Sequence, residues 1–374
     1  MNEESAGVPP ASGRMKTYLG KIATGPEQSK DLTESEAEDA LGLILSGSVS
    51  PVRAGVFLIA SRMKRETLAE NAGFWKALDR TTYKRSTNLA ELLQVADPFD
   101  GFDRVPYFGF YAIPVLAAMG LPSYGHSARS LPPKFGITFE DILQLHYRVP
   151  AGMGLDARVR LLEEFRFGYV DLCQSHPALE GLRQLRTEIV KRTALSTFEK
   201  MLQPVKSAGG ADYLASGYFH KGYEIPMMAA ARLSGFDKTV LGNGMEGTTL
   251  FGVHKSARIF ILEREKRDQE PREIRLAIEE MYSAGTAQKI HDAYAALKKE
   301  TARMDLLAEL GETALKSGGG PAAPLIASQA GVLIHLLGRV ANPQAGYDAA
   351  ERLLARGECH GRLMRYLDLC SGGG

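Results

Sequence analysis

Three helix-start signals follow one another near the N-terminus, and they constrain the fold more than any other feature of the chain. Thr33 has a glutamate three residues later, which makes a capping box, and Thr67 repeats the pattern. Between them, Ser50 precedes Pro51, and proline suits the first helical position because the N–H it lacks has no partner there. Apolar residues recur at helical spacing after each signal, and Gly47 ends the first run. The sequence therefore predicts three short helices joined by tight turns.

The pattern changes from about residue 89 onward. Glycine, proline and aromatic residues crowd together, and short β-rich segments alternate with helical ones. This alternation predicts an α/β fold in which a small N-terminal helical domain precedes a large α/β domain with a central, mostly parallel sheet. We expect strands ending at 97 and over 213–219, 238–242 and 258–262, helices over 155–173 and 181–202, and nearly all helix over 271–369. We expect residues 1–28 to be disordered, 29–86 to form the helical domain, 87–156 and 186–374 to form the α/β domain, and a helix over 157–185 to pack on the helical domain.

Charge and cysteine content narrow the class of protein. There are 45 Lys and Arg against 44 Asp and Glu, a net charge of +1, so nothing global attracts the chain to nucleic acid or to an anionic membrane. Only three cysteines occur, at wide spacing, which favours a reducing compartment and hence the cytoplasm. No apolar leader region and no apolar run of about 18 residues is present, so we expect neither export nor a membrane span.

Two segments have the composition of ligand loops. The loop 97–101 follows a predicted strand, and substrates of α/β proteins bind at such strand ends. A loop of this kind more often serves only to connect two elements. The stretch 124–130 contains Gly125, His126, Ser127 and Arg129, which suit a phosphate or carboxylate, and a solvated loop is the competing interpretation.

Two further features admit a structural explanation. His176 stands before Pro177 at a helix start, where capping alone would explain it. Six cations gather in 183–206, and a solvated helical face is favoured over an anion-binding strip. They are Arg183, Arg186, Lys191, Arg192, Lys200 and Lys206.

Short segments in a recognisable order run through the chain. They are Lys30-Asp31-Leu32-Thr33, Ile44-Leu45-Ser46-Gly47, the run 57–67, Phe167-Gly168, His176-Pro177-Ala178, the helix carrying Arg186 and Arg192, Asn243-Gly244-Met245-Glu246-Gly247, and the terminal segment 341–370. In this order they resemble the anthranilate phosphoribosyltransferase family, which is glycosyltransferase family 3 and has the nucleoside-phosphorylase fold. The resemblance extends over about 32–369 and implies a homodimer formed through the helical domains.

The resemblance implies a phosphate site at two loops that depart from the family pattern. The family's G-T-G-G-D loop, which folds around the pyrophosphate of phosphoribosyl pyrophosphate (PRPP), corresponds to 97–102, leaving Asp100 and Gly101 as candidates. The K-H-G-N-R segment corresponds to 123–127, which keeps Gly125 and adds His126 and Ser127, with Arg129 as a substitute donor. The lysine of the family segment has no counterpart in 123–127.

The resemblance also places an aromatic-substrate subsite and a metal site. His176 matches the histidine of the aromatic substrate, and either Arg186 or Arg192 matches the arginine that receives its carboxylate. The paired Asp-Glu that holds Mg²⁺ falls near Thr248-Thr249, which leaves Glu246 and predicts at most a weak Mg²⁺ site.

The segment 192–204 looks like that of a divergent branch of the family that has lost anthranilate transfer and includes non-specific nucleic-acid binders. We therefore expect little anthranilate transferase activity and an anionic, phosphoribosyl-like or nucleotide-like ligand in the interdomain cleft. Two alternatives stay open. One is an active transferase from PRPP to anthranilate or another aromatic amine. The other is a dimer that binds nucleic acid weakly through 183–206 and the cations of 255–267, which are Lys255, Arg258, Arg264, Lys266 and Arg267.

Overall fold

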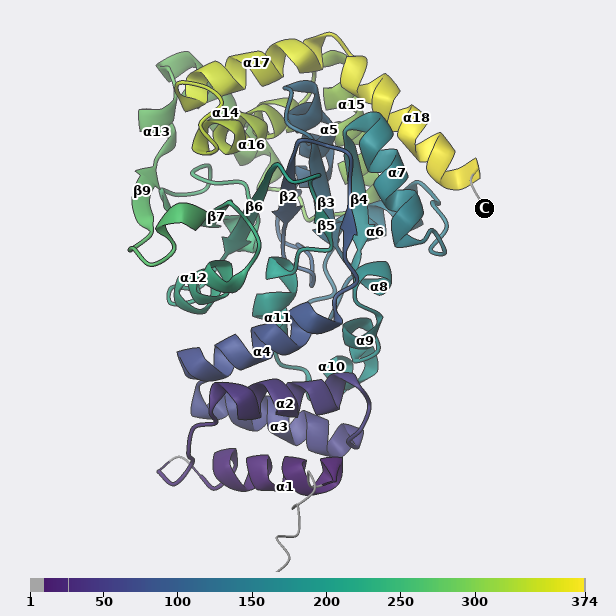
Figure 1. The fold of residues 1–374 in the computed structure, drawn as a ribbon. Coiled ribbons are helices and arrows are strands. Elements are labelled where there is room, and N and C mark those ends of the chain that lie inside the picture. Colours follow the sequence, from purple (N-terminus) through teal and green to yellow (C-terminus); the bar gives the residue numbers. More distant parts are fainter. Residues whose placement is uncertain (1–9, 26, 373–374) are drawn as a thin grey trace, which may run out of the picture.

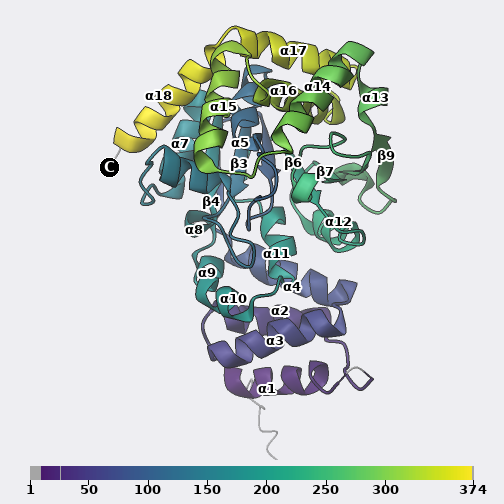
Figure 2. The ribbon, with the colours of Figure 1, turned by 180° about the vertical axis from the view of Figure 1, so that it is seen from behind.

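The computed structural model describes residues 10–25 and 27–372, in two parts that share a narrow waist (Figures 1 and 2). The smaller part is a bundle of the helices α1 (Ala11–Ile22), α2 (Glu34–Leu45), α3 (Pro51–Lys64) and α4 (Leu68–Thr81). The larger part is built on a twisted sheet with helices on both faces. The predicted fold class is confirmed.

The predicted caps start the helices of the bundle. The Thr33 and Thr67 hydroxyls each accept from the backbone N–H three residues later, with both capping boxes complete, and Ser50 caps α3. Helices α2 and α4 lie so close that a Cβ at Gly73 would stand 2.2 Å from the carbonyl oxygen of Glu34. Glycine is therefore required at this contact.

Helix α1 corrects part of the expectation of disorder over 1–28. Met15, Tyr18 and Ile22 form an apolar stripe that is buried against the bundle, and Arg14 pairs with Asp39 of α2 at 2.8 Å. Burial of that stripe outweighs the polar, glycine-containing composition that favoured disorder. Residues 1–9 and 26 lie outside the described residues.

In the described residues, the main sheet has seven strands in the order β4-β3-β2-β6-β7-β8-β9. The first five are parallel, β8 is antiparallel to β7, and β9 is antiparallel to β8. The strands are β2 (Glu91–Ala96), β3 (Ser123–Ser127), β4 (Phe167–Asp171), β6 (Ala211–Tyr218), β7 (Lys238–Asn243), β8 (Ala257–Glu263) and β9 (Arg272–Leu276). The strands expected near 97, 213–219, 238–242 and 258–262 are confirmed. A separate pair joins β1 (Arg85–Ser86) to β5 (Val205–Lys206) near the waist.

The C-terminal helices gather over the end of the sheet that lies away from the bundle (Figure 1). One of them, α16, is buried by the others along nearly its whole length because its residues are apolar on every side. These helices are α13 (Ile278–Met281), α14 (Ala284–Leu297), α15 (Met304–Ser317), α16 (Ala322–Leu336), α17 (Pro343–Ala355) and α18 (Glu358–Gly372). Helices α5 (Gly109–Ala118), α7 (Leu155–Phe165) and α12 (Glu224–Leu233) flank the strands. No helix in the described parts of the chain is long and apolar enough to cross a membrane.

The single helix expected over 157–185 is wrong. Helix α7 ends at Phe165, and the chain then forms β4 before the short helices α8 (Leu172–Ser175), α9 (Pro177–Glu180) and α10 (Arg183–Ile189). Strand β4 is buried on both faces, so its sequence does not alternate between apolar and polar residues. Its apolar run could not be told apart from the helix before it. The second half of the segment does reach the bundle. His176 Nε2 lies 3.0 Å from the Leu78 carbonyl of α4, and Leu185 packs near Gly55 of α3. Strand β9 likewise interrupts the all-helical pattern expected from residue 271.

Candidate functional site

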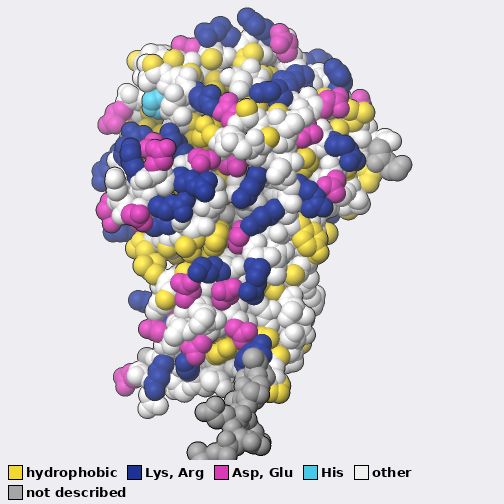
Figure 3. All heavy atoms as spheres, viewed as in Figure 1, with side chains coloured by type: hydrophobic (Ala, Val, Ile, Leu, Met, Phe, Trp, Pro, Cys, Tyr) yellow, Lys and Arg dark blue, Asp and Glu magenta, His cyan; other side chains and the backbone are white. Residues whose placement is uncertain are grey.

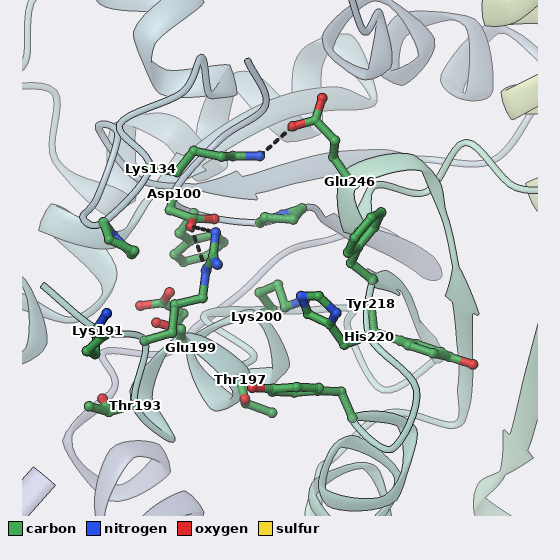
Figure 4. Close-up of a pocket in the computed structure, with 18 of the residues that line it drawn as sticks. Asp100, Lys134, Lys191, Thr193, Thr197, Glu199, Lys200, Tyr218, His220 and Glu246 are labelled. Atoms are coloured by element: carbon green, nitrogen blue, oxygen red, sulfur yellow. Dashed lines mark hydrogen bonds and ion pairs between the residues drawn. The ribbon is translucent and has the colours of Figure 1, made fainter. Parts of the chain in front are cut away.

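A cavity of about 440 Å³ lies at the waist, between the bundle and the carboxyl ends of the parallel strands (Figure 4). Its walls come from Arg62 of α3, the loop after β2, the segment 190–200, the residues after β6 and the turn after β7. Strand β2 is followed along the chain by β3 and β4 on one side, whereas β6 and β7 lie on its other side. The cavity therefore sits at the topological switch point, where ligands of open α/β sheets bind.

The walls of this cavity carry more cations than carboxylates. Each of the three lining carboxylates forms an ion pair, at N–O distances of 2.6–2.8 Å. The pairs are Asp100–Arg192, Glu199–Arg186 and Glu246–Lys134. Four other lining cations form no ion pair with a carboxylate among the described residues, and these are Arg62, Arg104, Lys191 and Lys200. The cavity thus keeps a positive excess that favours an anion.

Lys200 is the most deeply placed of these cations, at 6% exposure. Its Nζ donates to the carbonyl of Gly217 at 2.6 Å. Burial lowers the pKa of Lys200 to about 8, while the carboxylates of Asp97 and Asp100 act in the opposite direction. An anion beside Lys200 would therefore favour its charged form near neutral pH.

The loop after β2 is engaged with other parts of the protein. Pro98 has no N–H, Gly101 donates its N–H to the Pro98 carbonyl at 2.9 Å, and Phe102 donates to Ile137 at 3.1 Å. Gly101, with φ of 76°, packs against Gly136, whose carbonyl carbon would lie 2.3 Å from an added Cβ. Few amides are left over in this loop for a pyrophosphate.

Asp97, directly after β2, joins the end of this strand to two other segments. Its carboxylate accepts from the Thr249 N–H at 2.7 Å and from the Tyr107 hydroxyl at 2.5 Å. Burial raises the pKa of Asp97 to about 6. Both carboxylate oxygens of Asp97 are thus occupied by hydrogen bonds within the protein.

The residues present do not fit a Mg²⁺ ion held by paired carboxylates. Glu246, expected as the metal residue, accepts from Lys134 at 2.6 Å and from the backbone N–H of Arg104 at 3.0 Å, with two further backbone donors. Thr248 and Thr249, where the pair would fall, are buried and hydrogen-bonded within the protein. In the described residues, no three His, Cys, Asp or Glu side chains are grouped to hold a metal ion. The oxygens of Glu246 instead fasten the segment 103–105.

Of the other predicted site residues, Asp100 and Arg192 line the cavity, and Gly101 lies beside Asp100. Between the two arginines left open by sequence, Arg192 is therefore the one at the cavity. Arg186 is buried in its pair with Glu199 and does not line it.

The stretch around β3 does not reach the cavity. His126 is fully buried, with Nε2 3.4 Å from the Ser175 hydroxyl, and burial lowers its pKa to about 3, so it stays neutral. Ser127 is also buried, and a Cβ at Gly125 would stand 2.6 Å from the Phe139 ring. The phosphate role expected of these residues conflicts with their place inside the sheet.

Arg129 and His176 have structural partners instead. Arg129 donates to Asp141 at 2.7 Å, away from the cavity. The Nδ1 atom of His176 accepts from the Leu179 N–H at 3.0 Å, which confirms capping, and burial lowers the pKa of this imidazole. Of the residues that the sequence placed in the cleft, some line the cavity and the others have structural roles elsewhere in the protein.

The basic run 183–206 is not one surface face. Arg183 pairs with Glu180 at 2.6 Å, while Arg186 and Lys200 are buried. The cations of 255–267 are also partly paired, since Arg258 binds Glu273 at 2.8 Å. The ion pairs reduce the field that a nucleic acid would meet.

Sequence reasoning missed Lys134 and the aromatic residues after β6. Lys134 lies between prolines and a glycine with no pattern to mark it. Phe219 ends the strand predicted over 213–219, and His220 and Tyr223 come soon after it. The rule that ligands bind at strand carboxyl ends could have found them.

Known proteins resemble the chain in both parts. Residues 16–82 match the helical bundle domain of the glycosyl transferase family. An anthranilate phosphoribosyltransferase of Methylocella silvestris is 29% identical over 62% of this chain and 63% of its own length, and that of Agrobacterium fabrum is 28% identical over 64% and 67%. The matched stretch thus spans about two thirds or less of the length of these relatives.

Solved structures share the whole fold. Anthranilate phosphoribosyltransferase of Thermus thermophilus has a TM-score of 0.70 at 23% identity, covering 96% of this chain and 99% of its own. The Saccharomyces cerevisiae enzyme in complex with PRPP and Mg has a TM-score of 0.73 at 17% identity, covering 96% and 98%. The chain is therefore similar to anthranilate phosphoribosyltransferases in sequence over about two thirds of its length, and it shares their fold.

Proposed function

We propose that this protein binds a small anionic ligand, phosphoribosyl-like or nucleotide-like, in the cavity at the waist. The observation that carries the proposal is the set of four lining cations that form no ion pair with a carboxylate in the described residues, Arg62, Arg104, Lys191 and Lys200. Arginine and lysine are the usual partners of phosphate oxygens. A bound phosphate would satisfy them without breaking the existing ion pairs.

We further propose that the protein has little anthranilate transferase activity, as in the divergent branch of the family. Displacing pyrophosphate from a ribose is catalysed chiefly by positioning and by stabilising charge. Here the loop 97–102 offers few amides, and the cavity has no free pair of carboxylates among the described residues. Each loss is expected to lower the rate by about 10²-fold or more, by analogy with a single oxyanion donor.

Calorimetry with PRPP, pyrophosphate and AMP tests the binding proposal. Lys191→Ala should weaken the binding of each by roughly tenfold, the usual worth of a charge-assisted contact. Lys299→Ala, at an exposed position outside the cavity, is the matched control and should change nothing. If none of the three anions binds below millimolar concentration, the proposal is wrong.

An active transferase is the alternative, and the relationship to known transferases is the observation that favours it. The decisive assay supplies PRPP and Mg²⁺ with anthranilate, and in parallel with other aromatic amines. Robust turnover of anthranilate, or growth of a tryptophan auxotroph that carries this gene, would overturn the proposal of low activity.

We also propose a homodimer formed through the helical bundle. Helix α3 leaves Val52 and Met63 each 74% exposed and Val56 48% exposed, an apolar face that a second copy would cover. Light scattering on the eluting protein should give twice the chain mass. A mass near 40.7 kDa would contradict the dimer.

A further inference from the structure

An aromatic wall on one side of the cavity has no role in the features described above. It lies where β6 ends, at the carboxyl edge of the sheet, and continues to the start of α12. Phe219, His220 and Tyr223 line it, and Figure 4 shows His220 and Tyr218 on this side of the cavity. Phe219 is 41% exposed and Tyr223 is 40% exposed. Two large rings thus remain open to a ligand.

The Phe219 ring is oriented without being covered. The His220 ring meets it edge-on at 5.0 Å, with an interplanar angle of 83°, and the Lys255 ammonium lies over the ring at 5.8 Å from its centroid. These contacts hold the ring in one position while leaving much of it accessible. Preorganisation of this kind lowers the entropy cost of binding a planar partner.

The surroundings of the wall are apolar as well. Ile225, at the start of α12, is 59% exposed, and Figure 3 shows hydrophobic side chains collected at the level of α12 beneath a band of Lys and Arg. A sugar phosphate alone would leave the apolar wall unused.

Cations line other parts of the same cavity. Lys191 lies on the segment 190–200 and Arg104 on the loop after β2, both exposed. Neither side chain has a hydrogen bond or ion pair among residues 10–25 and 27–372. The cavity therefore combines open rings with free cations in about 440 Å³, a volume suited to one small ligand and not to a duplex.

From these observations we infer that the ligand class is a mononucleotide, whose base stacks on Phe219 or Tyr223 while its phosphate reaches the unpaired cations. Stacking recognises any base because every base has a π face. This inference rests on the proposed function and narrows it, since the same anion site is given a ring-specific part. It predicts that a ring-bearing phosphate binds better than the same phosphate without a ring.

Calorimetry with AMP, ribose 5-phosphate and pyrophosphate tests the inference. AMP should bind roughly tenfold or more tightly than ribose 5-phosphate. The double variant Phe219→Leu with Tyr223→Leu keeps the apolar character and loses the rings, so it should weaken AMP by about tenfold and leave ribose 5-phosphate unchanged. Retained ribose 5-phosphate binding also shows that the double variant is folded. Tyr83→Leu, which removes a 57% exposed ring outside the cavity, is the matched control and should not change either affinity.

The possible failures are distinguishable. Equal affinities for AMP and ribose 5-phosphate, or unaltered AMP binding by the double variant, would overturn the aromatic subsite and leave the anion proposal standing. Absence of binding for all three probes and for PRPP would overturn the proposed function itself. Tight binding of a short single-stranded oligothymidylate without binding of AMP would also overturn the mononucleotide and indicate a polynucleotide instead.

Discussion

Replacing Asp100 by asparagine should tighten anion binding, because Asp100 neutralises a cation at the cavity. Its carboxylate, only 9% exposed, accepts from the Arg192 Nε at 2.8 Å. Asparagine has the same shape and keeps an oxygen for Arg192, but it carries no charge. A phosphate on the other side of the guanidinium would lie roughly 6 Å from the Asp100 carboxylate, two hydrogen-bond lengths away.

At that separation the repulsion that Asp100→Asn removes is about 3 kcal/mol at an effective dielectric constant of 20, and about 0.7 kcal/mol in water. The cavity is open to solvent, so about 1–2 kcal/mol is expected, which corresponds to roughly 5- to 30-fold tighter binding. The loss of this ion pair, whose Arg192 side chain is 43% exposed, should lower the free energy of unfolding by about 1 kcal/mol or less.

The assay is calorimetry with AMP, performed once in EDTA and once in excess Mg²⁺. Asp103→Asn is the matched control, because this neighbouring carboxylate is 49% exposed on its side chain and lies 4.0 Å from Lys134, away from Arg192. It should have the smaller effect. Unchanged or weaker binding by Asp100→Asn in EDTA would show that Asp100 does not repel a bound anion. Weaker binding only in Mg²⁺ would show that Asp100 contacts a metal ion after all.

Three further predictions follow from buried or paired charges. Arg158→Met removes the cation that lies 2.9 Å from the buried Glu140 carboxylate, so chemical denaturation should show a free energy of unfolding lower by about 3–5 kcal/mol. Adding Glu140→Leu should recover most of that loss, and no recovery would contradict the pairing. Because the pKa of Lys200 is about 8, its charge is present at pH 7 and lost by pH 9, so calorimetry should show AMP affinity falling roughly tenfold between these two pH values. If Lys200→Met shows the same pH dependence, Lys200 is not its cause. Mobility shifts should detect only weak nucleic-acid binding at low salt, abolished by Lys191→Glu with Arg192→Glu, and tight, salt-resistant binding would show that the site lies elsewhere.

Much of the fold could be predicted from the sequence because its signals are local. A Thr33 hydroxyl caps the helix that follows it whatever the rest of the chain does, and the β-branched runs around 240 and 260 favour strands on their own. Strand β4 was missed because Phe167–Asp171 is buried on both faces and has no alternation to separate it from the preceding helix. Helix α1 was missed because its stability comes from burial against α2 and α3.

The candidate site depends on contacts that no local signal contains. The Ser216 hydroxyl donates to the Ala96 carbonyl at 2.6 Å across 120 residues of sequence, and this adjacency of β2 and β6 creates the crevice. The order of residues specifies which side chains are charged or aromatic, and it marks Asp100 and Arg192 as candidates. Folding then brings these two together with Lys200 and Phe219 at one cavity, while it buries His126 and Arg186. Caps and periodicity act within a few residues, whereas a cavity at a topological switch point is assembled from segments that meet only when the sheet forms.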